Sequence, residues 1–543
     1  MRIYLALSIF FYGLGILNPI HNKPYPSFFS EIFIFLSLIF LFLINKKNRV
    51  PLNFALIFLF YTGFFLITNF LISNNGEIEF YLIYIFSFIA SLTISYSMVK
   101  EGDIQNLFNI TAKVFIFLGL ISSIYAISQW LNLEIKYLTN NLIGLRPYAN
   151  FAQPNHLSTF LLLSLISVFY IYEKSNRNNF FLFMILIILM FGIVLTQSRT
   201  AWVIMFFIPI MVVFKSKKII LKLTKCYMLC IFFLFWMLVI SLPYINDLLN
   251  SRFNIIKING ISERVTSGYL RFDIWNQMIH AIKDKPWLGY GLGQTTSAQY
   301  AVIDTYHGRE WISSSHNIIL DILVWCGLPL GLILILYFGR MFWLFVLKSK
   351  SIETLCSGLM ISIMLIHAML EYPLNYAYFL LPFGFLCGIS LSEQKIKTIE
   401  ISNKYGYLAT IIGLLIVVQV FKEYAQITDN IVAANTHEMN ELKTEIELPY
   451  ESFFFDKYED RARWIAQYPY MEVNQNVLDL AERNLNSFLT PYDLYKYSIL
   501  LAHNGHKEMA ERQLKILKVM YGIDHSYESL FIKTQSVEIP SEN

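Results

Sequence analysis

The sequence carries little charge for its length. Asp, Glu, Lys and Arg make up 15% of its 543 residues, whereas a soluble globular domain has about 25%. Hydrophobic residues account for 56%, and the mean hydropathy is +0.50. A chain this poor in charge must have lipid as its solvent for much of its length. The net charge of +4 is small and basic residues stay in short loops, which argues against a nucleic-acid partner.

Cysteine is scarce as well, and metal-binding motifs are absent from the sequence. The five cysteines lie within or beside apolar runs, and none has metal-ligand spacing with histidine. The sequence contains no HExxH, no Ser-His-Asp order and no acidic metal cluster. We therefore expect no disulfide framework, no metal site and no cofactor. The cysteines are Cys226, Cys230, Cys326, Cys356 and Cys387.

Long apolar runs are abundant. A membrane-spanning helix needs roughly 20 predominantly apolar residues, and about thirteen such windows occur. No small-residue cleavage site follows the first window, so we interpret it as a spanning helix rather than a removed signal peptide. The sequence thus predicts an all-α, polytopic membrane helix bundle. The windows are 3–20, 29–45, 51–72, 78–98, 111–131, 155–172, 179–196, 200–214, 225–243, 316–345, 355–371, 375–392 and 406–422.

Basic residues occupy alternate short loops and so indicate the orientation, because Lys and Arg favour the cytoplasmic side. A cytoplasmic N-terminus satisfies every short loop and places the C-terminus outside. This topology predicts an N-terminal transmembrane region (1–243), a large external loop with an amphipathic helix (244–315), a C-terminal transmembrane region (316–422) and an external helical tail (423–543). The basic residues are Lys46, Lys47, Arg49, Lys100, Lys174, Arg177, Lys215, Lys217, Lys218, Lys222, Lys348, Lys350, Lys395 and Lys397.

The tail is charged and helical in pattern. Thr490 is a good N-cap before Pro491, which suits the first position of a helix. A second amphipathic helix is predicted from His506 to Met520, and the stretch 473–487 precedes both. This arrangement is similar to tetratricopeptide repeats. The tail is either a structural cap or a docking surface for a protein partner.

Two polar segments lie at the predicted outer ends of helices. Residues 146–156 contain Arg146, Gln153, Asn155 and His156, and Pro154 suits a helix start that puts His156 in the first turn at the outer interface. A capped helix start with an interfacial histidine would explain the same residues. Arg199 lies in a tight turn between two apolar windows. Because positive residues are disfavoured on this side, we favour anion binding over snorkelling to the headgroups.

The external loop carries a second group of polar residues. Leu270, Ile274, Met278 and Ile282 recur every four residues, which predicts a helix lying along the membrane surface. Arg271 sits in its first turn, where exposed amides also favour an anion. The segment Pro286–Gly293, which includes Tyr290, has no strand before it. It therefore fails as a dinucleotide-binding motif and indicates a Gly-rich re-entrant turn.

A serine-rich segment precedes the window 316–345. Ser315 is the expected N-cap, which would place His316 in the first turn, followed by Asn317. A histidine there keeps a pKa near neutral and can take a proton from a hydroxyl. His367 and Glu371 lie at an outer end of a later helix.

These residues form a metal-free set of arginines, histidines and one glutamate on a single side of a membrane. Arginine binds diphosphate through two parallel hydrogen bonds and stays charged. A lipid-diphosphate-linked donor that transfers its glycan to a hydroxyl matches these parts, because the departing diphosphate needs no protonation when arginines stabilise it.

At these residues the sequence resembles the bacterial O-oligosaccharyltransferases, the protein (pilin) glycosylation ligases of the O-antigen ligase and polymerase superfamily. The similarity covers most of residues 140–390. Its motifs are Phe151–His156, Gln197–Arg199, Pro286–Gly291, Ser315–Asn317 through Gly327–Pro329, and His367 through Glu371–Leu374.

The resemblance implies a function at the periplasmic face of a Gram-negative inner membrane. The donor would be an undecaprenyl-diphosphate-linked oligosaccharide, and the acceptor Ser or Thr of a pilin or another periplasmic protein. His316 and Glu371 would be catalytic, with His156 helping to shape the site. Many members carry Gln and Glu in the helix after the His-Asn pair, whereas this chain has Asp321 and Trp325 there, so a catalytic carboxylate at this place would have to be Asp321. Arg199, Arg271 and Arg146 would bind the diphosphate; Gln153, Asn155, His156, Tyr290, Asn317 and His367 would contact the glycan or the acceptor.

Two alternatives remain open. An O-antigen ligase or polymerase would use lipid A core or another lipid-linked glycan as acceptor, and the tail favours a protein acceptor over these. A transporter for an anionic lipid would show inverted repeats and charges near the membrane midplane. The charged residues here gather at one face instead.

Overall fold

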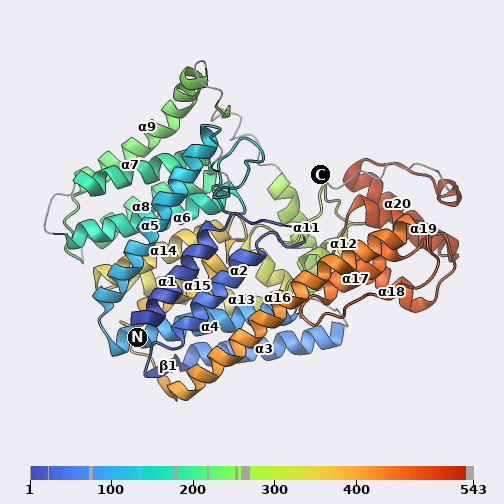
Figure 1. Ribbon diagram of the computed structural model, residues 1–543, viewed down its shortest axis with the longest axis horizontal. Coiled ribbons are helices and arrows are strands. Elements are labelled where there is room, and N and C mark those ends of the chain that lie inside the picture. The colour runs from blue at the N-terminus through green and yellow to red at the C-terminus, as the bar shows by residue number, and fades with distance from the viewer. Residues whose placement is uncertain are drawn as a thin grey trace. The chain divides into compact units, whose positions relative to one another are not determined.

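The computed structural model describes residues 2–22, 24–72, 78–133, 135, 137–175, 180–216, 219–250, 255–257 and 270–532. The predicted outer loop 73–77, Tyr269, and the basic residues Arg177, Lys217 and Lys218 lie outside these ranges. Within them the regular secondary structure is almost entirely helical (Figure 1). The first helices are α1 (Arg2–Leu17), α2 (Phe28–Leu41), α3 (Leu52–Ile72), α4 (Ile78–Glu101), α5 (Ile104–Trp130), α6 (Pro154–Lys174), α7 (Phe180–Leu195), α8 (Arg199–Lys215) and α9 (Lys225–Asn250).

The later elements include two helices of the external loop and four of the tail. They are α11 (Leu270–Asp284), α12 (Thr295–Val302), α13 (Ile318–Leu347), α14 (Ile352–Ala368), η1 (Pro373–Asn375), α15 (Ala377–Leu391), α16 (Asn403–Met439), α17 (Asp456–Ala466), α18 (Gln475–Leu485), α19 (Pro491–His503), α20 (Lys507–Tyr521) and η2 (Glu528–Phe531).

Every apolar window predicted from the sequence coincides with a helix. Six of the described helices (α4, α5, α6, α9, α13 and α16) are long and apolar enough to cross a membrane. Others, such as α1, α2, α7, α14 and α15, are apolar but shorter. The protein is thus a helical membrane protein, while the number of crossings stays a prediction. Helix α16 continues well past the predicted end of its window, to Met439.

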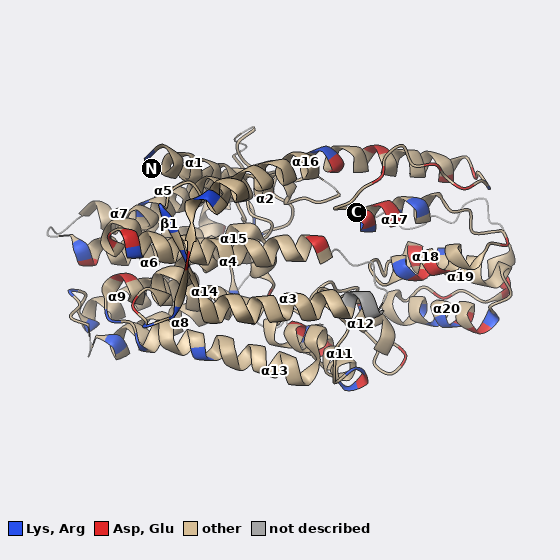
Figure 2. Cartoon of the chain, turned by 90° about the horizontal axis from the view of Figure 1, so that it is seen from below, with Lys and Arg blue, Asp and Glu red and all other residues tan. Residues whose placement is uncertain are grey.

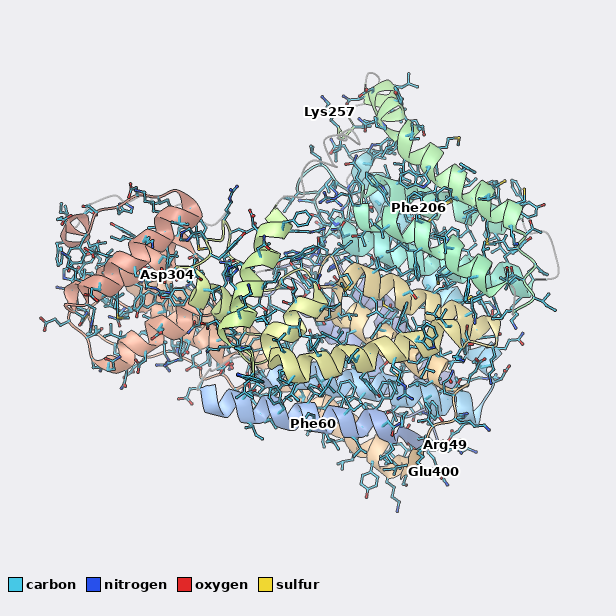
Figure 3. All side chains as sticks on the ribbon, turned by 180° about the vertical axis from the view of Figure 1, so that it is seen from behind. Arg49, Phe60, Phe206, Lys257, Asp304 and Glu400 are labelled. Atoms are coloured by element: carbon cyan, nitrogen blue, oxygen red, sulfur yellow. The ribbon has the colours of Figure 1, made fainter. Side chains whose placement is uncertain are left out.

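The all-α prediction missed one short pair of strands. β1 (Lys47–Pro51) and β2 (Thr398–Ser402) pair antiparallel, with Arg49 opposite Glu400. Glu400 lies 2.9 Å from Lys47 Nζ and 3.2 Å from Arg49 Nε (Figure 3). Each strand is too short and too isolated in sequence to predict, because its only partner lies some 350 residues away in the chain.

The chain forms two compact units. The first contains residues 1–58, 84–267 and 337–417, and the second contains 59–83, 268–336 and 418–543. Four of the five boundaries fall inside helices, namely α3, α4, α13 and α16. These units are defined by packing, and the predicted division of the chain by membrane topology stays a prediction.

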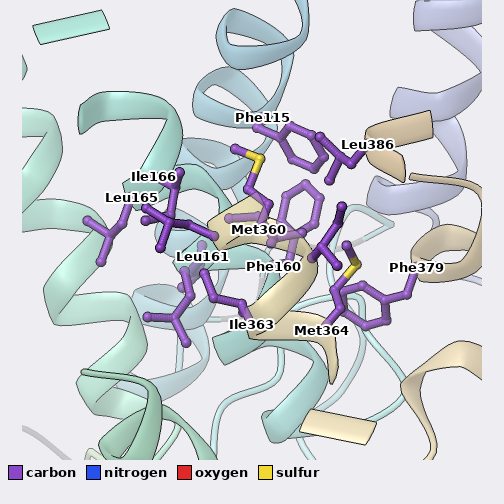
Figure 4. Close-up of a cluster of buried hydrophobic side chains, with 14 of the residues drawn as sticks. Phe115, Phe160, Leu161, Leu165, Ile166, Met360, Ile363, Met364, Phe379 and Leu386 are labelled. Atoms are coloured by element: carbon purple, nitrogen blue, oxygen red, sulfur yellow. The ribbon is translucent and has the colours of Figure 1, made fainter. Parts of the chain in front are cut away.

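Helix α6 is central to the first unit, where it packs against α5, α7 and α14. Phe160 and Leu161 are fully buried there beside Met360 and Met364 of α14 (Figure 4). Small residues allow the helices to approach closely, as lipid-embedded helices require. A Cβ on Gly119 of α5 would lie 2.3 Å from the Ser164 hydroxyl of α6.

The tail helices of the second unit follow the sequence prediction. Thr490 caps α19, with its hydroxyl accepting a hydrogen bond from the Asp493 amide, and Pro491 is the first helical residue. Helices α17–α20 carry charged residues along their length, whereas α3 and α13 carry few (Figure 2). The tail core includes Trp464, Tyr497 and Leu517. Tyr300 of α12 and Ile303, which follows that helix, also belong to this core.

Candidate functional site

Three predicted site residues form one hydrogen-bonded chain in the first unit. Arg146 donates from Nε to the Thr196 carbonyl over 2.8 Å and from Nη2 to Asn155 Oδ1 over 3.1 Å. Asn155 Nδ2 donates in turn to Glu371 Oε1 over 3.1 Å. A loop, the start of α6 and the segment after α14 thus meet at one buried amide.

Local sequence explains each of these positions. Gln153 is extended and Pro154 begins α6, as predicted, so that Asn155 lies in the first turn. Glu371 follows the end of α14, where its amide donates to the His367 carbonyl. Pro373 then prevents the helix from continuing.

Arg199 begins α8 after the predicted tight turn. Ser198 is the N-cap, its hydroxyl accepting from the Ala201 amide, and Gln197 has a positive φ of 49°. The Thr196 carbonyl that binds Arg146 belongs to the same turn. The fold therefore brings Arg146 to the turn that carries Arg199, and both arginines are partly exposed.

His156 and His367 are fully buried, although His156 was expected at the interface. His156 Nδ1 lies 2.6 Å from the Tyr378 hydroxyl, and its Nε2 lies 3.1 Å from Gln153 Nε2. His367 Nδ1 lies 2.8 Å from the Thr159 hydroxyl, and its ring packs edge-to-face on His156. With both nitrogens engaged, His156 suits the shaping of a site better than contact with an acceptor.

Sequence reasoning missed a buried carboxylate beside this group. Glu31 of α2 is 3% exposed, and its Oε2 accepts from the Tyr84 hydroxyl and from the Ala377 amide, each over 2.8 Å. Ala377 begins α15, one residue before Tyr378. The signal was available, because an acidic residue inside an apolar window costs at least about 2.5 kcal/mol unless it has a function or partners.

In the second unit, α11 forms where the apolar spacing predicted it, but its apolar face was assigned wrongly. Ile274, Met278 and Ile282 are buried inside the protein rather than turned to a membrane. The face packs inward because α12 lies against α11. Arg271 is in the first turn, as expected, and is partly exposed.

The Gly-rich segment fills a break in α13. Gly327 is non-helical and Pro329 has no amide hydrogen, so the carbonyls of Val324 and Trp325 lose their helical partners. The Tyr290 amide donates to Val324 over 2.8 Å, and the Gly291 amide donates to Trp325 over 3.2 Å. Two motifs that are separate in the sequence are therefore one structural feature.

Tyr290 is itself buried, and its hydroxyl donates to Asp284 over 2.7 Å. Burial, together with this carboxylate, raises the pKa of the Tyr290 hydroxyl. Its contact with a glycan stays a prediction.

His316 precedes α13 instead of lying in its first turn. The helix begins at Ile318, and Asn317 caps it, with Oδ1 accepting from the Ile319 amide over 3.0 Å. Ser315, the expected cap, instead accepts from the Asn317 amide. His316 has a positive φ of 54° and is partly exposed. The turn thus presents the imidazole outside the helix.

The predicted site residues accordingly fall into two groups. Arg146, Gln153, Asn155, His156, Arg199, His367 and Glu371 belong to the first unit, and Arg271, Tyr290, His316 and Asn317 to the second. Among the residues that the structure describes, no three His, Cys, Asp or Glu side chains gather as metal ligands would.

Comparison with known families defines the class of protein. Residues 182–336 match the family described as O-Antigen ligase, and residues 355–533 match Virulence factor membrane-bound polymerase, C-terminal. Residues 147–171, which begin directly after Arg146 and include the start of α6, match Protein glycosylation ligase. These three descriptions agree with the resemblance that the sequence motifs indicated.

Two relatives from Acinetobacter baylyi narrow the assignment. The chain is 31% identical over 554 residues to a General O-oligosaccharyltransferase, covering 97% of this chain and 94% of that protein. It is 33% identical over 408 residues to a ComP-specific O-oligosaccharyltransferase, covering 72% and 71%. The chain therefore belongs to the O-oligosaccharyltransferase family of glycosyltransferases, which confirms the resemblance seen in the motifs.

Proposed function

We propose that this protein transfers an oligosaccharide en bloc from undecaprenyl diphosphate to Ser or Thr of a pilin or another periplasmic protein. The observation that carries the proposal is similarity to a general O-oligosaccharyltransferase along nearly the whole chain, tail included. The hydrogen-bonded chain from Arg146 through Asn155 to Glu371 supports the proposal. It links the segment that matches Protein glycosylation ligase to the motif that contains Glu371.

The residues divide the chemistry between them. Arg146, Arg199 and Arg271 bind the diphosphate and stabilise its negative charge as it leaves. Neutral His316 accepts the proton of the acceptor hydroxyl. The acceptor oxygen forms a bond to the anomeric carbon, the bond from that carbon to the diphosphate oxygen breaks, and the lipid diphosphate leaves with the electron pair. Attack from the opposite face inverts the anomeric configuration.

The Glu371 carboxylate already accepts a hydrogen bond from the Asn155 side chain. We assign it to holding the site's charged groups in place, together with His156. Gln153, Asn155, His367, Tyr290 and Asn317 are assigned to the glycan or the acceptor, either by contact or by shaping the surface that receives them.

The proposed setting is the Gram-negative inner membrane, with the site facing the periplasm. About thirteen crossings, a cytoplasmic N-terminus and a periplasmic tail agree with the basic loops and with the helices observed. We retain the division at 243, 315 and 422 for the membrane topology. The tail, α17–α20, is proposed as a tetratricopeptide-like surface that docks the acceptor protein.

A second candidate is an O-antigen ligase or polymerase, which the family matches to O-Antigen ligase and to a membrane-bound polymerase favour. Its acceptor would be a glycan on lipid A core or on another lipid. The transporter alternative loses its basis, because the chain belongs to a transferase family.

The deciding experiment expresses the chain with an undecaprenyl-diphosphate glycan pathway and a pilin, in a host that lacks its own ligase. Mass spectrometry of the pilin should show a gain equal to the glycan, and His316→Ala should abolish it. His307→Ala, at an exposed histidine outside the tail that is not a predicted site residue, is the matched control. An unmodified pilin beside newly glycosylated lipid A core would favour the second candidate instead.

A further inference from the structure

We propose that Asp321 is a positioning residue for His316, and that α12 extends this support to the tail helix α20. The tail would then help to hold the catalytic turn, in addition to docking an acceptor. This inference rests on the proposed function, in which His316 acts on the acceptor hydroxyl. All residues involved belong to the second unit.

Asp321 is the anchor of the turn that carries His316. Its side chain is 3% exposed. Oδ2 accepts from the Ser314 hydroxyl over 2.7 Å, and Oδ1 accepts from the Ser315 amide over 2.9 Å. The Ser314 hydroxyl also accepts from the His316 amide over 3.2 Å. The Ser314 hydroxyl thus links the carboxylate to the His316 backbone through two successive hydrogen bonds.

A carboxylate with this many donors serves as a fixed point rather than as a free base. The Thr295 hydroxyl donates to Asp321 Oδ1 over 3.3 Å, and Trp325 Nε1 donates to the Thr295 oxygen over 3.0 Å. Its buried charge is therefore compensated by oriented donors. The positive φ of His316 needs such support, because a non-glycine residue adopts that conformation at a cost.

Thr295 is the first residue of α12, whose other end reaches the tail. The Tyr300 hydroxyl donates to Gln513 Oε1 of α20 over 3.1 Å. Arg512 donates from Nη2 to the Tyr300 carbonyl over 3.2 Å and from Nε to Asp304 over 2.6 Å (Figure 3 labels Asp304). The helix is buried along most of its length.

Gln299, in the middle of α12, binds the chain segment that precedes His316. Its Oε1 accepts from the Ile312 amide over 3.1 Å, and its Nε2 donates to the Glu310 carbonyl over 2.8 Å. The chain segment that leads into the His316 turn is therefore bound to the same short helix as the tail. A displacement of α20 would be transmitted to the turn through packed, hydrogen-bonded groups rather than through solvent.

The test separates docking from positioning by using a short Ser-containing peptide, which is too small to need the tail, as acceptor. Full-length enzyme in proteoliposomes receives the lipid-linked glycan donor, and kcat and the donor KM are measured for both the peptide and the whole acceptor protein. Arg512→Met removes the bonds to α12. Lys515→Met, at an exposed position of the same helix, is the matched control.

We expect Arg512→Met to lower kcat with the peptide about 5-fold or more, as typical couplings between sites do, with the donor KM unchanged. Asp321→Asn should lower kcat by roughly 100-fold, because a misplacement of ~1 Å is enough for such a loss. With the peptide, which does not need the tail for docking, Lys515→Met should transfer glycan at the wild-type rate. A tail that merely docks the acceptor would leave peptide transfer at the wild-type rate in Arg512→Met, and this result would overturn the proposal.

If Arg512→Met fails to fold, Tyr300→Phe tests the same link. This substitution removes a single hydroxyl, which binds Gln513, and retains the ring. Thermal unfolding in detergent monitors the fold of each variant. A fall in kcat at unchanged unfolding temperature supports positioning, whereas an unchanged kcat refutes it. Wild-type enzyme that transfers glycan to neither acceptor would instead contradict the proposed function.

Discussion

The side-chain amide of Asn155 is held between charges of opposite sign, with its oxygen facing Arg146 and its nitrogen facing Glu371. The contact to Glu371 joins residues 216 positions apart in the chain. Each end of the amide meets the charge it prefers, so its orientation is fixed. A residue that was singled out as a glycan contact therefore also connects Arg146, a proposed diphosphate ligand, to Glu371.

This geometry predicts that Asn155→Asp will be far more damaging than its small change in size suggests. The new carboxylate would face Glu371 in a buried place, at a cost of about 2 kcal/mol or more. The measurement is glycan transfer per unit of folded enzyme. The double variant Asn155→Asp with Glu371→Gln should recover part of that loss, because glutamine donates where glutamate repels. Failure of the second change to restore any transfer would show that the amide is not acting through Glu371.

The break in α13 predicts that Gly327→Ala will prevent stable folding. A Cβ on Gly327 would lie 2.5 Å from the Trp287 carbonyl group, and φ there is +71°. The conformation alone costs about 1–2 kcal/mol for a residue with a side chain. Gly339→Ala, in the same helix with open space around it, should be neutral or slightly stabilising. Unfolding temperatures in detergent compare the two, and equal values would contradict the packing described.

Glu31 predicts a graded response to substitution. Glu31→Leu would leave the Ala377 amide and the Tyr84 hydroxyl without an acceptor, at a cost of about 1–3 kcal/mol for each buried group. Glu31→Gln keeps an acceptor oxygen and should lose less. Unfolding temperature is again the measurement, with glycan transfer recorded beside it. Equal losses in the two variants would mean that the charge of Glu31, rather than its hydrogen bonds, is what the fold requires.

His21 predicts a loss of stability in acid. Its Nδ1 lies 3.0 Å from Asn140 Nδ2, and burial lowers the pKa of the His21 imidazole from 6.5. Because the folded state holds the neutral ring, this contact contributes above the unfolded pKa and is lost as the pH falls through 6.5 and below.

The check is unfolding temperature between pH 7.5 and 5, conditions that bracket the pKa of histidine at about 6.5. The fall should be smaller in His21→Gln, whose amide oxygen accepts from Asn140 without titrating. An identical pH profile in the two proteins would assign the acid sensitivity to other groups.

Much of the fold could be predicted from residue pattern alone, because apolar helices in lipid satisfy their own backbone hydrogen bonds. The start of α6 at Pro154 and the Thr490 cap of α19 were predicted correctly, since both depend on a few neighbouring residues. The cap prediction was wrong at α13, where two neighbouring residues compete for the role. Ser315 and Asn317 are both good caps, and the bond from Asp321 to the Ser315 amide selects Asn317.

Other features depend on contacts that no local pattern contains. The apolar face of α11 would suit a membrane as well as a protein core, and α12 decides between them. The strand pair at Arg49 and Glu400 needs both strands at once. Glu31 could be recognised as costly, but the Ala377 amide that accounts for it lies 346 residues away.

The sequence by itself determined three things: that this is a membrane protein, which residues form its helices, and which polar residues require an explanation. It could do so because composition and periodicity are local properties of the chain. Only the tertiary structure decided which of those residues meet. It placed Arg146 and Glu371 on one amide, buried His156 against Tyr378, and set the Gly-rich segment into the break of α13. The physical reason is that a hydrogen bond is satisfied by geometry in space, and separation along the chain says nothing about that geometry.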